Sequence, residues 1–272
     1  MNKKTIIIAG IAVLALGGFV FWKMSGGKCP LALQSGQRSG SGSAKSAVAR
    51  DRESQGDILG ARQEYQRLIG EFPNSREVLV WQKKTQELNI KLLFSVIMTP
   101  ECVEYEIKPG DSLDRIARIH GTTVELIKKS NNLASDNIFP GKKIKVWGAP
   151  FSIVVDKSQN TLLLKTGDTV FKSYTVATGL NNSTPVGTFK IIEKIPNPPW
   201  YKPGAVIPAG SPENILGTRW LGLTKEGYGI HGTTDPKSLG NQVTAGCVRM
   251  ANQDVEELYN IVPVGVEVTI VD

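Results

Sequence analysis

Hydrophobic and polar positions divide this 272-residue chain into segments with different periodicities. Residues 5–22 form an uncharged apolar run, "TIIIAGIAVLALGGFVFW", with lysines on both sides. As a helix rising about 1.5 Å per residue, this run would reach roughly 27 Å, close to the hydrocarbon thickness of a bilayer. We therefore predict an N-terminal transmembrane helix, a membrane anchor or signal-anchor, at residues 1–24.

A cleaved signal peptide is the competing interpretation of this run. The run is long for a signal peptide, and residues 25–30 lack the small-residue pattern of a cleavage site. Lipid attachment at Cys29 is disfavoured, since two glycines and a lysine precede it. Lysines on both flanks leave the orientation of the helix open.

Residues 25–46 contain the Gly/Ser-rich stretch "SGQRSGSGSAKS", which predicts a flexible tether. Residues 47–97 predict helices, because apolar positions recur every three or four residues. Gly-Asp at residues 56–57 and Pro-Asn at residues 73–74 mark breaks in this pattern.

This helical segment resembles a tetratricopeptide repeat (TPR). Ala61, Tyr65, Leu68 and Pro73 match the spacing of such a repeat's second helix. A plain helical hairpin that serves as a spacer is the alternative interpretation. Under either one, the segment is a possible site for a protein partner.

Residues 105–147 begin and end with short alternating runs and carry two helical periods between them, which predicts a βααβ unit. The segment resembles a LysM domain at Pro109–Leu113, Ile116-Ala117, Asn131–Leu133 and Pro140-Gly141. The resemblance implies binding to glycan that contains N-acetylglucosamine, in a groove between two loops. The residues assigned to those loops are Gly110, Asp111, Ser112, Leu113, Ile138, Pro140 and Gly141. His120 is interpreted as an exposed histidine at a helix end, without chemistry.

Residues 150–272 predict a compact, mainly-β domain with one helix. Short runs rich in β-branched residues alternate with turn signals, and "GVEVTIVD" closes the chain with another such run. The segment "NQDVEELYNI" predicts the helix, with Asn252 as its N-cap and Asp254 in its first turn.

Candidate chemistry lies in residues 231–250, "HGTTDPKSLGNQVTAGCVRM", which hold one of two histidines and one of three cysteines. The alternation in "GYGIHGT" places His231 at or near a strand end, and an extended "CVRM" puts Cys247 and Arg249 on one side. An imidazole can accept a thiol proton, and a guanidinium favours the thiolate. Gly246 would let a reacting carbonyl approach, with backbone N–H groups at Gly246 and Cys247 forming an oxyanion hole.

Other interpretations of this pair are a core histidine, an inert buried thiol, or part of a metal site. One histidine and one cysteine, without a second pair of ligands close by in the sequence, do not make a zinc site, so we expect neither a metal nor a cofactor.

Cys29 and Cys102 remain, and a disulfide between them is conceivable outside the cell.

Four segments, "STPVGTFKI", "RWLGL", "YGIHGT" and "AGCVRM", together resemble the YkuD-type L,D-transpeptidase catalytic domain over residues 150–272. The resemblance implies that Cys247 is the nucleophile, His231 the general base, and Gly232 the residue whose carbonyl orients the imidazole. Arg249 would support the site or a substrate carboxylate. Many family members have Ser-His before Gly-Cys, whereas this chain has Thr-Ala at residues 244–245.

The resemblance also implies a function in the bacterial cell envelope. Cys247 would form a thioester with a peptidoglycan tetrapeptide stem and transfer it to an amine, with the catalytic domain outside the cytoplasm. An L,D-carboxypeptidase and a non-catalytic wall-binding anchor are the alternatives. The charge of +7 suits an anionic partner. We expect peptidoglycan stem peptides, glycan strands and the membrane as partners, and no nucleic acid.

Overall fold

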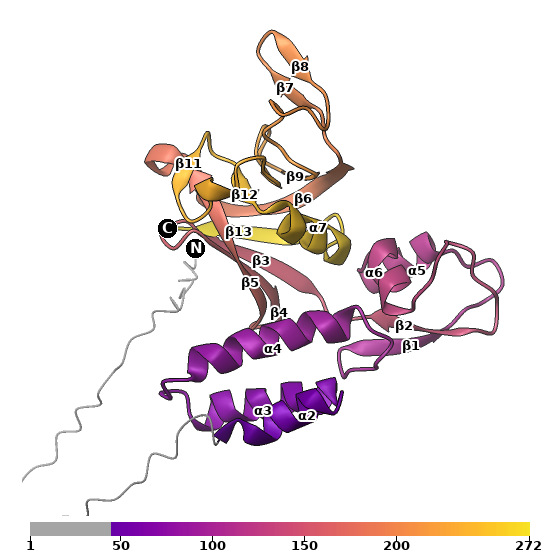
Figure 1. Cartoon of the computed structure of the whole chain (residues 1–272). Helices are drawn as coiled ribbons and strands as arrows, with labels where there is room; N and C mark the ends of the chain where they lie inside the picture. Colours follow the sequence, from indigo (N-terminus) through magenta and orange to yellow (C-terminus); the bar gives the residue numbers. More distant parts are fainter. Residues whose placement is uncertain (1–44) are drawn as a thin grey trace, which may run out of the picture. The chain divides into compact units, whose positions relative to one another are not determined.

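The computed structural model describes residues 45–272 (Figure 1). The predicted membrane anchor at residues 1–24 and nearly all of the tether at residues 25–46 lie outside the described residues. Between residues 45 and 272, no helix is both long enough and apolar enough to cross a membrane.

The C-terminal segment folds around one mixed sheet, as the alternating sequence pattern predicted. Its strands are β3 (Phe151–Asp156), β4 (Thr161–Thr166), β5 (Thr169–Gly179), β6 (Gly187–Pro196), β9 (Arg219–Leu223), β10 (Gly229–His231), β11 (Gln242–Thr244), β12 (Val248–Met250) and β13 (Glu267–Val271). Their order is β11-β5-β12-β10-β9-β6-β13-β3-β4, and β4 also pairs with β5. The sheet therefore closes on itself through β5, which pairs with β12 and with β4.

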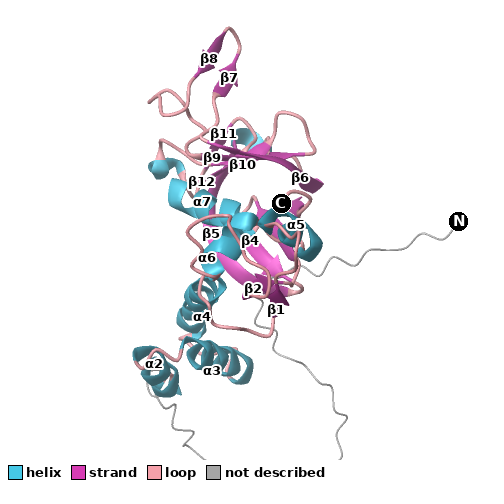
Figure 2. Ribbon diagram, turned by 90° about the vertical axis from the view of Figure 1, so that its right-hand side faces the viewer, coloured by secondary structure: helices cyan, strands magenta, loops and turns pink. Residues whose placement is uncertain are grey.

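Alternation along the strands places the core on one face of this sheet. Ile153 and Val155 of β3 are at most 1% exposed, while Val154 between them is half-buried. Helix α7 (Asn252–Ile261) has the bounds of the predicted helical segment and adds three fully buried apolar side chains to the core. The hairpin of β7 (Trp200–Lys202) and β8 (Ala205–Ile207) extends away from the sheet (Figure 2).

The N-terminal segment has three helices, α2 (Ala47–Ser54), α3 (Ile58–Glu71) and α4 (Val78–Leu93). Both predicted breaks follow the end of a helix, so the segment has one helix more than a simple hairpin. Asp57 starts α3 by accepting a hydrogen bond from the Gly60 N–H at 2.9 Å. The resemblance to a TPR stays a prediction.

Side chains at the predicted helical spacing are buried within this helical segment. Ala61, Tyr65 and Leu68 are at most 2% exposed and form one apolar cluster with Trp81 and Leu88 of α4.

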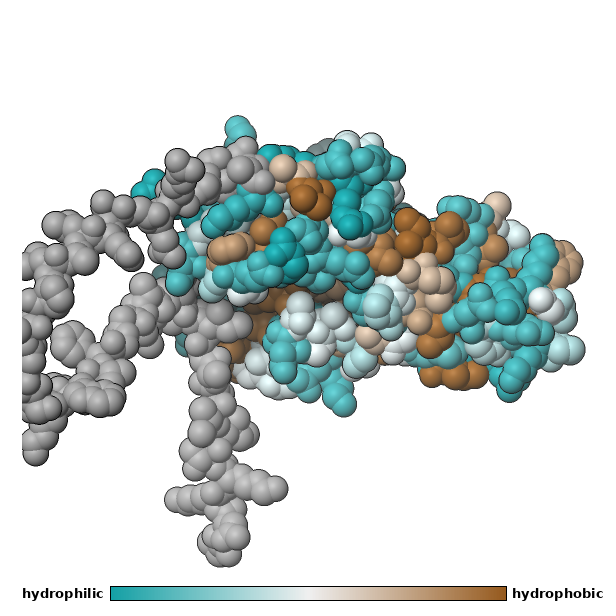
Figure 3. All heavy atoms as spheres, turned by 90° about the horizontal axis from the view of Figure 1, so that it is seen from below, coloured by the Kyte–Doolittle hydropathy of each residue, from teal (hydrophilic) through white to brown (hydrophobic). Residues whose placement is uncertain are grey.

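Seen from below Figure 1, hydrophilic residues cover most of the surface of the molecule, with hydrophobic side chains in several separate patches (Figure 3).

Helix α4 also packs against the sheet. The Asn89 side chain donates a hydrogen bond to the Phe171 carbonyl at 2.9 Å, and the Gln86 side chain accepts one from the Ser173 N–H at 3.0 Å. Leu93, at the end of α4, belongs to the apolar core of the sheet. This helix is therefore part of the packing of β5.

The βααβ prediction for residues 105–147 is confirmed. The elements are β1 (Cys102–Glu106), α5 (Leu113–His120), α6 (Val124–Ser130) and β2 (Lys143–Trp147). The hydroxyls of Ser112 and Thr123 cap the two helices, and Gly121 ends α5 in the left-handed region at φ +64°. The two strands pair antiparallel, with Tyr105 opposite Ile144.

The buried Lys145 links this βααβ unit to the C-terminal end of α4 through hydrogen bonds. Lys145 is 4% exposed, and its ammonium donates hydrogen bonds of 2.7 Å to the carbonyls of Leu92 and Ser95. Leu92 lies in the last turn of α4 and Ser95 lies two residues beyond its end, where the helix dipole favours positive charge. Burial lowers the pKa of Lys145. On the other side of the unit, the Thr123 hydroxyl donates to the Asn260 carbonyl of α7.

Trp147 joins the βααβ unit to the core of the sheet. Its ring is 3% exposed and stacks on Phe151, with centroids 5.1 Å apart, and meets Phe171 edge-on at 5.5 Å. The predicted domain boundary between residues 147 and 150 thus runs through an apolar cluster. Removing residues 105–147 would strip an aromatic ring from the core of the sheet.

We predict that Trp147→Ala lowers the free energy of unfolding of the full-length chain by about 3–5 kcal/mol, because it leaves a large cavity between two aromatic rings. Denaturant unfolding measures the change. Tyr201→Ala is the control, since the Tyr201 side chain is 74% exposed and should change stability by about 0.5 kcal/mol or less. Equal losses in the two variants would contradict this role of Trp147.

Candidate active site

His231 is the last residue of β10, and Cys247 directly precedes β12, the parallel strand beside β10. In the pairing of β10 with β12, Ile230 is opposite Val248 and His231 is opposite Arg249. Ile230 and Val248 are buried in the core, at 0% and 1% exposure, so His231 and Arg249 point to the other face. Cys247 directly precedes β12 and is two residues before Arg249, which places it on the side of His231.

The imidazole of His231 is buried and held in one orientation. The side chain is 2% exposed, and Nδ1 lies 2.7 Å from the Gly232 carbonyl oxygen. Since a carbonyl only accepts, Nδ1 carries a proton and the other ring nitrogen, Nε2, is left as a base. The Trp220 ring of β9 stacks on the imidazole at a centroid distance of 6.0 Å. Burial lowers the pKa of His231 to about 4, with the charge of Arg249 acting in the same direction.

Cys247 is half-buried, and its Sγ lies 3.6 Å from the Gly227 carbonyl oxygen. Burial raises the pKa of the Cys247 thiol, although the Gly229 N–H and the charge of Arg249 both act to lower it. The predicted effect of the guanidinium is present, but desolvation outweighs it. The resting site therefore holds a neutral thiol and a neutral imidazole.

A threonine hydroxyl shapes the loop that carries Cys247. Thr244 Oγ1 donates to the Cys247 carbonyl at 2.7 Å and accepts from the Gly246 N–H at 3.2 Å. The Gly246 N–H is thus engaged in the loop, and the predicted oxyanion role for this group is not supported. Gly246 instead serves the backbone: its φ is +136°, and a Cβ there would lie 2.7 Å from the Tyr228 ring.

Arg249 contacts the short 3₁₀ helix η2 (Pro236–Ser238). Its Nη1 donates to the Ser238 hydroxyl at 3.0 Å, while its Nε is buried and has no hydrogen-bond partner among the described residues. The guanidinium supplies positive charge to both His231 and Cys247.

Asn252 was predicted to cap helix α7, and this prediction is wrong. Ala251 is the N-cap residue, and Asn252 is the first residue inside the helix. Its carboxamide instead bonds to the backbone of Thr218 and Thr233, next to Gly232. Nothing in the local sequence pattern separates this role from capping, because asparagine at a helix start is typical of both.

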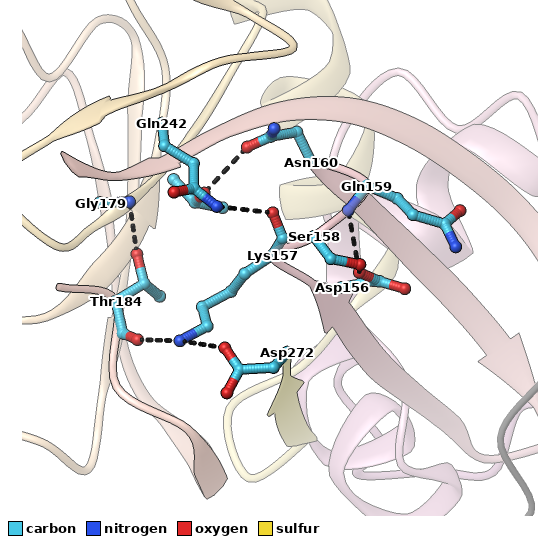
Figure 4. Close-up of polar contacts among 10 residues, drawn as sticks. Asp156, Lys157, Ser158, Gln159, Asn160, Gly179, Thr184, Gln242 and Asp272 are labelled. Atoms are coloured by element: carbon cyan, nitrogen blue, oxygen red, sulfur yellow. Dashed lines mark hydrogen bonds and ion pairs between the residues drawn. The ribbon is translucent and has the colours of Figure 1, made fainter. Parts of the chain in front are cut away.

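The buried Lys157 forms polar contacts with three separate parts of the chain, through Thr184, Gln242 and Asp272 (Figure 4). Lys157 is 2% exposed, and its ammonium donates to the Thr184 carbonyl at 2.9 Å and pairs with Asp272 at 2.8 Å. The Gln242 side chain of β11 donates to the Lys157 carbonyl at 3.2 Å. Lys157 thus contacts β11, the strand that leads into the loop carrying Cys247. It also contacts Thr184, and the neighbouring Ser183 lies beside Gly246 in that loop.

Three of the residues assigned to the glycan-binding loops have internal roles. The Asp111 carboxylate accepts hydrogen bonds from the Tyr105 hydroxyl and the Lys108 N–H at 2.8 and 2.9 Å. Ser112 caps α5, and Leu113 is 2% exposed in the core of the unit. Side-chain recognition of glycan by Leu113 is therefore excluded by its burial.

The other assigned loop residues lie at turns or at the surface. Gly110 and Gly141 form turns at φ +83° and +82°, and Pro140 is exposed. Ile138 lines a hollow of about 180 Å³ together with Phe139, which is 61% exposed and was not predicted.

The remaining predictions concern single residues. His120 is half-buried rather than exposed, with its ring edge-on to Tyr105 at 5.5 Å. Cys102 is a free thiol in contact with the Thr99 hydroxyl at 3.3 Å, and Cys29 lies outside the described residues. From residue 45 onward, no three His, Cys, Asp or Glu side chains are grouped so as to hold a metal ion.

Comparisons with known proteins agree with the sequence pattern. A family model described as the L,D-transpeptidase catalytic domain, YkuD, matches residues 150–270, and a LysM domain model matches residues 105–147. YkuD of Bacillus licheniformis, named as an L,D-transpeptidase, is 37% identical over 174 residues, which cover 61% of this chain and 97% of the relative. YqjB of Bacillus subtilis, named likewise, is 40% identical over 141 residues, which cover 50% of this chain and 78% of the relative.

A solved L,D-transpeptidase structure from Mycobacterium smegmatis is also similar to part of the chain. It has a TM-score of 0.39 and 24% sequence identity, and the match covers 48% of this chain and 64% of that chain.

We predict that the free energy of unfolding decreases as pH falls from 6.5 to about 4, with His231 contributing roughly 3 kcal/mol of the decrease. The unfolded chain binds a proton at His231 as pH falls through 6.5, whereas the buried imidazole resists protonation until about pH 4. Denaturant unfolding at several pH values measures the slope. His231→Gln should lose the His231 contribution to this decrease in the free energy of unfolding and keep the contribution of the carboxylates. Identical slopes in both chains would contradict a neutral buried imidazole.

We predict that Gly246→Ala slows the reaction of Cys247 with a thiol-directed alkylating reagent at least about tenfold, since the new methyl group displaces the Tyr228 ring or the loop. Gly240→Ala is the matched control: Gly240 also has a positive φ, +83°, but a Cβ there meets nothing closer than 3.9 Å. The control should lose stability and keep thiol reactivity. If both variants react like the wild type, crowding at Gly246 does not shape the site.

Proposed function

The chain belongs to the YkuD family of L,D-transpeptidases, and on this premise we propose that it is a cysteine-dependent acyltransferase of peptidoglycan. The observation that carries the proposal is the orientation of His231: its Nδ1 is bonded to the Gly232 carbonyl on the face that also presents Cys247. This arrangement leaves a basic ring nitrogen for the thiol proton.

The nucleophile is activated by proton transfer rather than by a standing thiolate. Because the pKa of Cys247 is raised and that of His231 is lowered, both groups are neutral before substrate binds. As Sγ attacks the substrate carbonyl, the Cys247 proton moves to Nε2 of His231. The resulting imidazolium is then the acid that protonates the leaving amine.

The oxyanion of the tetrahedral intermediate needs backbone donors. Since the Gly246 N–H bonds to Thr244, we assign this role to the N–H of Cys247 itself. Thr244 holds the Cys247 carbonyl and thereby fixes the peptide that follows the nucleophile. Arg249 supports the developing negative charge.

The proposed substrate is a tetrapeptide stem. Cys247 attacks the carbonyl after the third residue, the bond to the terminal D-alanine breaks, and a thioester remains on Sγ. An amine of a second stem then attacks the thioester, the new amide forms, and the thiol regains its proton. No ATP or metal is required, because the thioester conserves the energy of the cleaved amide.

The LysM domain would hold the enzyme on glycan strands. We propose that the hollow at Ile138 and the exposed Pro140 and Phe139 contact the sugar, with the turns at Gly110 and Gly141 presenting backbone groups. The site then works in the bacterial cell envelope, with residues 1–24 as the anchor in the cytoplasmic membrane and residues 47–97 as a possible docking segment for a protein partner.

We predict that the full-length chain converts a tetrapeptide-bearing muropeptide into a cross-linked dimer and free D-alanine, detected by mass spectrometry of the products. Cys247→Ala should abolish turnover and the acyl adduct on the intact protein. Cys102→Ala, which removes the other described thiol, should retain both.

Each other outcome of this experiment has a distinct meaning. Tripeptide without dimer would show hydrolysis and favour the L,D-carboxypeptidase. Binding to sacculi with neither product would favour the non-catalytic anchor. Turnover by Cys247→Ala would refute the proposed nucleophile.

A further inference from the structure

One peptide group connects the Asn252 side chain to the imidazole of His231. The Gly232 carbonyl oxygen accepts from His231 Nδ1 at 2.7 Å, and the N–H at the other end of the same peptide, that of Thr233, donates to Asn252 Oδ1 at 3.0 Å. A peptide is planar and rigid, so its two ends turn together. The group that binds the Thr233 N–H therefore also fixes the direction of the Gly232 carbonyl.

The Asn252 carboxamide is bound from three directions. Oδ1 also accepts from the Thr218 N–H at 3.2 Å, and Nδ2 donates to the Thr233 carbonyl at 2.9 Å. Two donors face the oxygen and one acceptor faces the nitrogen, so only one orientation of the amide satisfies all three contacts.

Two glycines make room for this carboxamide. A Cβ at Gly232 would lie 2.1 Å from Asn252 Oδ1, and one at Gly217 would lie 2.2 Å from it. Asn252 itself is fixed by helix α7, whose Val255, Leu258 and Ile261 are fully buried in the core. The carboxamide therefore links the core of the domain to the backbone behind the imidazole.

The imidazole has a second carbonyl beside it. The Leu216 carbonyl acts to raise the pKa of His231, as the Gly232 carbonyl does. The Gly232 carbonyl lies within hydrogen-bond distance of Nδ1, so its aim decides whether that ring nitrogen carries the proton.

We propose that Asn252 is a positioning residue: by holding the Gly232–Thr233 peptide, it keeps the proton of His231 on Nδ1 and leaves Nε2 free to accept the proton of Cys247. The inference rests on the proposed base role of His231. It assigns the third member of the catalytic arrangement to a side chain that acts through the backbone, where the resemblance implies only the Gly232 carbonyl.

The tautomer of His231 tests the proposal without any turnover. The chain has two histidines, so ¹⁵N-histidine labelling of the full-length protein in a His120→Gln background leaves one imidazole in the nitrogen spectrum. In the otherwise unaltered chain we expect the proton on Nδ1. A proton on Nε2 would overturn the proposal by itself.

Variants at position 252 supply the second measurement. Asn252→Leu removes all three contacts, and we expect a mixture of tautomers and a kcat lower by about 10- to 100-fold, with little change in KM. Asn252→Asp keeps an oxygen for the Thr218 and Thr233 N–H groups but loses the donor to the Thr233 carbonyl, and should restore the Nδ1 tautomer and part of kcat. If Asn252→Leu does not fold, Asn252→Ala removes the same contacts with less bulk.

Asn89→Leu is the matched control, since Asn89 also joins two elements through one side-chain hydrogen bond and lies outside the site. It should lose stability and keep both tautomer and kcat. A folded Asn252→Leu with an unchanged tautomer and unchanged kcat would overturn the inference. An inactive wild-type chain would refute the proposed reaction, and its tautomer and that of Asn252→Leu would still decide this inference.

Discussion

The parallel pairing of β10 with β12 is the constraint on which the candidate site depends. It sets His231 opposite Arg249 and places Cys247 on the same side, while Ile230 and Val248 point into the core. A slip of one residue would turn each of these side chains to the other face. Both strands have only three residues, so their register depends on β9 and β5, which pair with them from outside.

Close approach of backbone and side chains makes the site rigid. The Trp220 ring fills the space where Gly229 lacks a side chain, the Asn252 carboxamide does so at Gly232, and the Tyr228 ring at Gly246. Each of these groups touches the backbone that carries His231 or Cys247. A site supported in this way holds its reacting groups in place before substrate binds, which is the main physical requirement for electrostatic catalysis.

Periodicity in the sequence predicted what depends on local pattern. It gave the bounds of α7 and the βααβ unit. It did not predict which strands become neighbours: β13, at the end of the chain as given, pairs between β6 and β3 in the sheet. Such pairings depend on contacts between distant residues, for which a single sequence has no signal.

The same limit applies at individual residues. Asp111, Ser112 and Leu113 match a glycan-binding motif, and their side chains also hold the loop, cap a helix and fill a core. The motif reflects residues needed for the fold as well as for binding. For Cys247, the sequence identified the charged partner, but burial, which determines the direction of the pKa shift, depends on tertiary packing.

Burial of the pair gives the proposed enzyme a protected resting state. Oxidants attack the thiolate, so a thiol with a raised pKa reacts slowly with them in an oxidising compartment. Arg249 lowers the pKa of both Cys247 and His231, so it helps the thiol to release its proton and hinders the imidazole from accepting it. The two pKa changes oppose each other when the Cys247 proton moves to His231. When the leaving amine is protonated, only the lowered pKa of His231 matters, because an imidazolium of low pKa gives up its proton more readily. The charge of Arg249 therefore favours breakdown of the tetrahedral intermediate to the thioester more than it favours attack.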